Sequence, residues 1–316
     1  MRVHFFAYGH HEFMEKHLAE PVSRCLAEGH TQQGELEDGT RFVILNGVTD
    51  QQPPEQSEAV IVSCGDLRLP PEKEYTLEMY ARESVHGGAG NTYRAVLSDH
   101  DIALGPNSTT LRWVHACQSV NAGEGCTLWG RVSAGERLTL DKDTVFERLN
   151  APCIEFGEPV DPLTPAREGE RLDPGDVPHL IDDSAGRWLV KGKLDIPDNR
   201  RVEANLVVTG GGRIGDGTTI KGSIKSHKDL YLGRGVKVDG SVVSQRDIYL
   251  DEGCRIRGPI LAERVVHIQR GCVLGSPEQA TTVSARRARV APGVVAYGTF
   301  WAHEEGHVMV VPRKDG

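Results

Sequence analysis

The chain has 316 residues, enough for one large or two ordinary domains, and a formal net charge of −9 at pH 7. Aromatic residues make up only 6% of it and 36 residues are glycine, which favours a repetitive all-β protein with many corners over a helical bundle. The overall acidity argues against a general nucleic-acid binder, and the sequence has no run of 18 apolar residues that could span a membrane.

The distribution of charge and the cysteine content indicate possible partners and the cellular compartment. Residues 1–186 hold 15 Lys and Arg against 31 Asp and Glu, whereas residues 187–316 hold 21 against 14. The basic half could contact an anionic surface or the acidic half of a neighbouring molecule, or its charges could simply be solvated. The seven cysteines form no CxxC pair, which indicates reduced thiols in a cytoplasmic protein, and no metal or other cofactor is predicted.

The N-terminal segment, residues 1–59, is predicted to hold a short helix and a strand. The helix is expected over 11–28 despite Pro21, and the strand over 41–48. Its apolar face would consist of Phe13, His17, Leu18, Val22 and Leu26. Residues 3–8 are apolar but too few for a signal peptide, and residues 50–58 are expected to form a loose loop. This segment could cover the open end of the block that follows.

Residues 60–157 form a first repetitive block. Gly125-x-x-Leu128-x-Gly130-x-Val132 is followed by Leu138-x-Leu140, a pattern that recurs more strongly in the second half of the chain. Steps of 17 or 18 residues lead to the residues at the position of Gly125 in the other coils: Glu72, Gly90, Asn107 and Asp143. The aliphatic or aromatic residue that follows each of them, as Leu128 follows Gly125, is Tyr75, Tyr93, Leu111 or Phe146. The block therefore holds about five coils.

The connection at residues 158–186 is rich in Pro, Asp, Glu and Gly. This composition predicts an exposed linker between two blocks.

The second block, residues 187–303, has a clear 18-residue period. Gly217, Gly235, Gly253 and Gly271 mark successive coils, and Asn199 and Gly293 extend the series, the latter after a four-residue insertion within 275–286. The matching core ladder consists of Ile220, Val238, Ile256 and Leu274. Six coils are predicted here.

An 18-residue period divides into three faces of six residues. Every sixth residue from 214 to 274 is aliphatic or small, with Ser226, Ser244 and Ala262 on every third face. Alternating apolar residues broken by Gly, Asn, Asp and Pro are typical of short strands with one buried side and sharp corners. The fold is therefore predicted to be all-β: a triangular parallel β-helix whose coils stack at about 4.8 Å. Cys254, Cys272 and Cys126 would be small core residues.

The C-terminal end is apolar. A β-helix exposes unpaired backbone groups at its last coil, and such an edge pairs with another chain unless it is covered. Residues 304–316 are predicted to form a tail. Phe300, Trp301, Val308 and Val310 are the candidate assembly surface, through which this end would dock on another molecule. The alternative is that Phe300 and Trp301 form an internal cap.

Several histidines are candidate catalytic residues. Hexapeptide acyltransferases and gamma-class carbonic anhydrases share a triangular coil, and they need a histidine base or three histidines around a metal. The candidates are His86, His100, His115, His227, His267, His303 and His307. His227 and His267 lie 40 residues apart and so do not occupy equivalent positions of the repeat, and the coils from Ile214 to Leu274 run without a long loop that could carry catalytic groups. No catalytic residue is assigned, and a non-enzymatic protein is predicted. Such an enzyme remains the alternative; a binding module for an anionic partner is a further one.

The motifs resemble a known family. The block from Leu194 to Gly275, with Asp229-Leu-Tyr-Leu-Gly-Arg-Gly and Asp247-Ile-Tyr-Leu-Asp-Glu-Gly, is similar to the bactofilins, polymer-forming cytoskeletal proteins of bacteria. The resemblance implies a right-handed β-helix that polymerises end to end without nucleotide. It also implies a scaffold for cell-shape or envelope machinery in the cytoplasm, with contact to the inner face of the membrane. Two blocks and a long N-terminal extension set this chain apart from small bactofilins.

Overall fold

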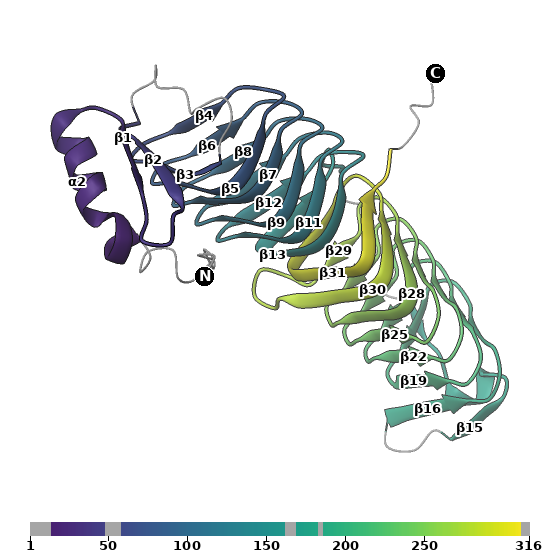
Figure 1. The fold of residues 1–316 in the computed structure, drawn as a ribbon. Coiled ribbons are helices and arrows are strands. Elements are labelled where there is room, and N and C mark those ends of the chain that lie inside the picture. The colour runs from purple at the N-terminus through teal and green to yellow at the C-terminus, as the bar shows by residue number, and fades with distance from the viewer. Residues whose placement is uncertain (1–13, 48–57, 162–168, 183–185, 311–316) are drawn as a thin grey trace, which may run out of the picture. The chain divides into compact units, whose positions relative to one another are not determined.

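The computed structural model confirms the predicted fold class. It describes residues 14–47, 58–161, 169–182 and 186–310 (Figure 1). The protein is 6% helix and 55% strand, and its strands form a β-solenoid of about 14 turns of roughly 18 residues. None of the helices in these residues has the length and apolarity needed to span a bilayer.

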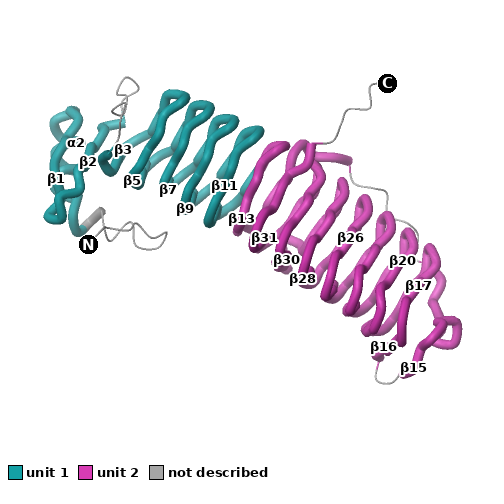
Figure 2. Tube along the Cα trace, turned by 45° about the vertical axis from the view of Figure 1, so that its right-hand side comes forward, with its two compact units in different colours: residues 1–139 teal, residues 140–316 magenta. Residues whose placement is uncertain are grey.

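The chain divides into two compact units, residues 1–139 and 140–316 (Figure 2). Unit 1 opens with a π-helical turn, η1 (Met14–Leu18), and the helix α2 (Ala19–Glu28). Its strands are β1 (Gln32–Glu35), β2 (Arg41–Leu45), β3 (Ala59–Ser63), β4 (Leu67–Leu69), β5 (Glu74–Ala81), β6 (Val85–Gly87), β7 (Thr92–Ser98), β8 (Ile102–Leu104), β9 (Thr109–Ala116), β10 (Ser119–Ala122), β11 (Thr127–Ala134) and β12 (Arg137–Leu140), whose last residue begins unit 2.

Unit 1 is a stack of parallel coils with three strand ladders. One face is the ladder β4, β6, β8 and β10. The long strands β5, β7, β9 and β11 bend across the other two faces, so each contributes two short ladder segments. The coil of β7 is one residue shorter than its neighbours, which produces a bulge on each side of it.

The prediction for Leu111 in this block was wrong. Thr110 fills the inward position of its coil and is buried, whereas the side chain of Leu111 is 50% exposed.

The N-terminal segment covers the first coil of unit 1. β2 runs parallel to β3, and β1 pairs antiparallel with β2. Leu18 and Cys25 of the helical segment are buried in one cluster with Phe42, Ile44 and Val62. Pro21 falls in the first turn of α2, where its missing N–H would be unpaired in any case. The helix therefore closes the apolar end of the stack.

Unit 2 contains nineteen strands and one short 3-10 helix in the described residues. They are β13 (Val145–Phe156), β14 (Glu170–Arg171), η2 (Pro174–Asp176), β15 (Leu180–Asp182), β16 (Arg187–Val190), β17 (Leu194–Ile196), β18 (Arg200–Val202), β19 (Asn205–Val208), β20 (Gly212–Ile214), β21 (Thr219–Ile220), β22 (Ile224–Ser226), β23 (Leu230–Leu232), β24 (Lys237–Val238), β25 (Val242–Ser244), β26 (Ile248–Leu250), β27 (Arg255–Ile256), β28 (Ile260–Ile268), β29 (Val273–Leu274), β30 (Thr281–Val290) and β31 (Val294–Val308).

Three parallel ladders again make the faces of the coil in unit 2. One runs through β17, β20, β23, β26 and on to β28, a second through β18, β21, β24, β27 and β29, and a third through β16, β19, β22, β25 and β28. The predicted core ladder is confirmed, because Ile220, Val238, Ile256 and Leu274 are all buried. The predicted four-residue insertion is also present, since Ile268 pairs with Val290.

The cysteines of the repeat are core residues, as predicted. Cys126, Cys254 and Cys272 are buried. The thiols of Cys254 and Cys272 each donate to a backbone carbonyl of the preceding coil at 3.1 Å. The hydrogen bond with Cys272, together with burial, raises the pKa of the Cys254 thiol, so this thiol stays protonated.

The backbone is left-handed at the corner whose residues recur about every 18 positions in the sequence. All its residues have positive φ: Glu72, Gly90, Asn107, Gly125, Asp143, Asn199, Gly217, Gly235, Gly253, Gly271 and Gly293. Glycine adopts this conformation without strain, and Asn and Asp tolerate it better than other residues do. The repeat is thus detectable because one backbone conformation recurs in every coil.

Polar side chains tie the corners of successive coils together. The carboxylate of Asp198 accepts the N–H of Asp216 at 2.9 Å, and that of Asp216 accepts the N–H of Arg234 at 2.9 Å. Each of these bonds satisfies a backbone N–H at the corner that has no partner in the strand ladders. The corners are therefore fixed from one coil to the next.

The predicted linker is partly built into the fold. β14 pairs with β18, and β15 pairs antiparallel with β16, so residues 170–182 lie on the first coil of the second block. Leu172 and Val177 are buried there. The boundary of the C-terminal tail also needs correction: β31 continues to Val308, so the strand extends beyond residue 303.

Substitution of Gly235 tests the corner. A Cβ at this position would meet no atom within 4 Å, so the cost of a side chain comes from the backbone alone, at φ +64°. We expect Gly235→Val to lower the free energy of unfolding by about 1–2 kcal/mol. Gly235→Asn should cost less than half as much, because Asn107 and Asn199 occupy equivalent corners. Equal losses in chemical denaturation would contradict this account of the corner.

Candidate functional site

The C-terminal end of the solenoid in unit 2 is covered by the chain itself. β13 pairs antiparallel with β31, with Leu149 opposite Phe300 and Phe156 opposite Val294. Phe146, Phe156 and Phe300 form a buried cluster with ring centroids 5.3–5.7 Å apart. At the rim, His307 Nε2 lies 2.9 Å from Asp143 Oδ1. β13 thus supplies the backbone partners that the last coil would otherwise lack.

This arrangement corrects the predicted assembly surface. Phe300 and Val308 are completely buried inside unit 2, so they are not available to another molecule, and for Phe300 the internal cap is the arrangement found. Trp301 is 39% exposed and Val310 is 54% exposed. Trp301 stacks on His303 at 4.1 Å, and the guanidinium of Arg148 on β13 lies 5.0 Å from the centroid of its ring. No local pattern in the sequence indicated that β13 pairs with this end.

The candidate histidines lie apart, each in its own surroundings. His303 and His307 are both on the strand β31, which continues into the segment that was predicted to be a tail. His303 Nε2 lies 2.9 Å from Ser284 Oγ, and in unit 1 His115 Nδ1 lies 2.8 Å from Ser133 Oγ. His86 is 4.0 Å from Asp66, His100 is 3.4 Å from Glu83, and His227 is exposed. No group of three His, Cys, Asp or Glu side chains suited to a metal occurs in the described residues.

An outward-facing ladder crosses one face of unit 2. Register pairing places Asp195, Arg213, Tyr231, Tyr249, His267, Arg289 and His307 on successive coils. The rings of Tyr231 and Tyr249 stack at 4.4 Å with an angle of 5°, and those of Tyr249 and His267 stack at 4.6 Å with an angle of 3°. The coil spacing alone brings these rings into contact.

Two hollows flank this ladder. One, of about 410 Å³, lies beside the three rings, with Asp216 and Asp251 on its wall. The other, of about 540 Å³, lies at the Tyr231 end of the stack, beside the glycines 210–212 and Lys193 and Lys228. Sequence analysis quoted the Leu-Tyr-Leu and Ile-Tyr-Leu motifs only as markers of the repeat. The tyrosines between their buried residues were the signal for an outward ladder.

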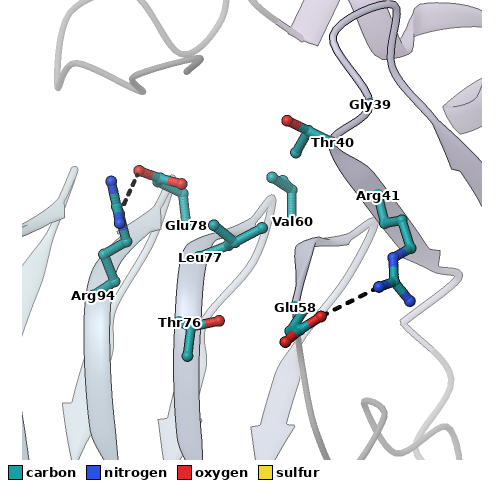
Figure 3. A pocket seen from close by; sticks show the side chains of 9 residues that line it. All are labelled: Gly39, Thr40, Arg41, Glu58, Val60, Thr76, Leu77, Glu78 and Arg94. Carbon is teal, nitrogen blue, oxygen red and sulfur yellow. Dashed lines mark hydrogen bonds and ion pairs between the residues drawn. The ribbon is translucent and has the colours of Figure 1, made fainter. Parts of the chain in front are cut away.

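A third hollow, of about 460 Å³, lies in unit 1 between β2, β5 and β7 (Figure 3). Glu78 is a buried carboxylate on its wall, and its Oε1 is 3.1 Å from Nε of Arg94. Arg41 and Glu58 form a second, exposed pair at 3.2 Å. The figure shows that each charge in the hollow is turned toward an internal partner, which makes the pair Glu78–Arg94 a structural bridge between neighbouring coils.

Truncation of Phe300 tests the closed end. Phe300→Ala would leave a cavity between Phe146 and Phe156, so we expect the free energy of unfolding to fall by about 3–5 kcal/mol. Trp301→Ala is the matched control on the same strand, and because its ring is partly exposed the loss should be much smaller. Chemical denaturation followed by circular dichroism measures both. Comparable losses for the two variants would contradict the internal position of Phe300.

Acidification tests the ring stack. Burial lowers the pKa of His267 below its ordinary value of 6.5, so the folded protein holds this ring neutral more strongly than the unfolded chain does. The contribution of the neutral His267 ring to the free energy of unfolding is fully present above pH 6.5. It is lost as the pH falls through the lower pKa that His267 has in the folded protein. We expect His267→Tyr, which keeps the stack but does not titrate in this range, to lose less stability than the wild type between neutral and mildly acidic pH. Parallel losses measured in urea would disprove the role of His267.

Comparison of the chain with known proteins gives no match to a family model, to a curated protein or to a solved structure. The likeness to bactofilins therefore rests on the sequence motifs. The functional argument rests on the geometry of the coils, their ends and their outward ladders.

Proposed function

We propose that the chain is a structural scaffold that associates with copies of itself, the role that its likeness to bactofilins implies. The observation that carries the proposal is the regular stack of coils from Ile214 to Leu274. Every sixth residue in this span is buried, and Ser226, Ser244 and Ala262 let the backbone close around a filled interior. A filled, evenly spaced stack is a rigid support, because each coil is held by both of its neighbours.

The ends of the stack decide where copies could meet. The last coil of unit 2 is closed by β13, and the first coil of unit 1 is closed by α2, β1 and β2. At the first coil of the second block, β15 covers β16 and β14 covers β18. Among the described residues, β17 pairs only with β20. In the part of the chain that the structure describes, β4 of unit 1 likewise pairs only with β6. We place the end-to-end contact at β17, which lies at the first coil of the regular second block.

The backbone of β17 supports this assignment. The N–H of Leu194 donates to Gly211 at 3.0 Å, and the carbonyl of Ile196 accepts from Gly215 at 2.8 Å. Because peptide groups alternate in a parallel ladder, the N–H and C=O of the intervening Asp195 point away from the stack. They are available to an added strand from a second copy. As part of the same proposal, the assembled scaffold lies in the cytoplasm, at the inner face of the membrane, and serves envelope or cell-shape proteins.

Blocking β17 tests the proposed contact. Asp195→Pro removes the outward N–H and places a ring on the edge, while the hydrogen bonds of Leu194 and Ile196 to the next coil can remain. Asp195→Asn is the matched control: it also removes the ion pair of Asp195 with Arg213 at 3.6 Å, but keeps the N–H. In sedimentation velocity we expect the wild type and Asp195→Asn to form large species, and folded Asp195→Pro to sediment as a small one.

Assembly by Asp195→Pro equal to that of the wild type would exclude β17 as the contact. A wild type that stays monomeric at all concentrations would contradict the scaffold proposal itself. A discrete trimer would favour the enzyme alternatives, since those enzymes form their sites between three subunits.

A further inference from the structure

The stack of rings on unit 2 ends at a partly open aromatic face. Tyr249 lies between Tyr231 and His267, but Tyr231 has a ring on one side only and is 47% exposed. On the open side of Tyr231, the neighbouring coil places Arg213 at the equivalent position of the ladder. Arg213 Nη1 lies 3.6 Å from Asp195, one coil further on, so its guanidinium is engaged away from the stack.

The surface beyond Tyr231 is hollow because the chain has glycine there. Residues 210–212 are all glycine, and together with Gly192 they line the hollow of about 540 Å³ next to Tyr231. The hollow opens broadly to solvent, as a site for a protruding side chain does. A site for a small molecule usually encloses most of its ligand.

The charge around this hollow is mainly positive. Lys193, Arg213 and Lys228 line it, against the single carboxylate of Asp229. Arg213 is paired with Asp195, while neither Lys193 nor Lys228 forms an ion pair with any residue that the structure describes. Two exposed ammonium groups beside an aromatic face suit a ligand that combines a flat ring with nearby negative charge.

We propose that Tyr231, Lys193 and Lys228 form a docking site for an aromatic side chain carried by an acidic segment of a partner protein. The inference rests on the scaffold function and names the class of partner that the scaffold would hold. The partner's ring stacks on the open face of Tyr231, and its carboxylates lie against the two lysines. A nucleic-acid strand fits less well, because Asp216 and Asp251 flank the other side of the ring stack and would repel phosphates running along it.

Titration calorimetry on the full chain tests the site with a defined probe, the acetylated and amidated peptide Asp-Glu-Trp-Glu-Asp. We expect saturable binding to the wild type, and roughly three- to tenfold weaker binding when the tryptophan of the peptide is replaced by leucine. Tyr231→Leu should weaken binding of the tryptophan peptide by a similar factor, while Tyr231→Phe, which keeps the ring, should bind like the wild type.

The lysines are tested in the same way. Lys193→Gln and Lys228→Gln should each weaken binding and reduce its dependence on salt, whereas Lys237→Gln, the same charge change on a different face, should have no effect. Equal affinity for the tryptophan and leucine peptides, or no binding to the wild type, would overturn the proposal. Tighter binding of adenosine monophosphate or of a thymidine oligonucleotide would overturn it in favour of a nucleotide site. Self-assembly is measured separately by sedimentation, so failure of the docking site leaves the scaffold proposal to be judged by its own test.

Discussion

The structure depends on one constraint: a coil of 18 residues can bury its apolar side chains only against the coils on either side of it. Ile220, Val238 and Ile256 are buried because each lies between equivalent residues of neighbouring coils. The same constraint sets the corners, which take a left-handed conformation and are occupied by Gly, Asn or Asp in every coil of the series except that of Glu72. It also creates the outward ladders, since side chains on equivalent positions are carried to within contact distance.

The constraint leaves the first and last coils unsatisfied, and the chain closes most of these ends with its own segments. A helix with a strand pair closes unit 1, and in unit 2 the strand β13 and residues 170–182 close opposite ends of the second block. Such closure limits uncontrolled edge pairing. β17, which pairs on one side only, offers a second copy a three-residue edge at the first coil of the second block, and for this reason the proposed scaffold contact depends on Asp195 and its outward peptide groups.

The sequence predicted what repeats and missed what does not. The 18-residue step located the corners and the core, because a conformation or a buried position that recurs in each coil leaves a periodic signal. It failed at Leu111, where the aliphatic residue lies beside the inward Thr110. It could not reveal that Asn150 bonds to Thr299, because nothing in a local period pairs residues 149 positions apart. The predicted assembly surface was wrong for that reason. The outward tyrosine ladder was not predicted, because the 18-residue period identifies the inward positions of the coil.

Cross-linking within unit 2 tests the stacking of coils most directly. Lys225 and Val243 are register partners on neighbouring coils, and Leu261 follows on the next. Parallel strands lie about 4.8 Å apart, within the Cα separation of a disulfide, whereas two coils span about 9.6 Å, beyond it. Cysteines at 225 and 243 should therefore cross-link intramolecularly on oxidation, and cysteines at 225 and 261 should not. Efficient cross-linking of the 225–261 pair, or none of the 225–243 pair, would contradict the stacked coil and the function built on it.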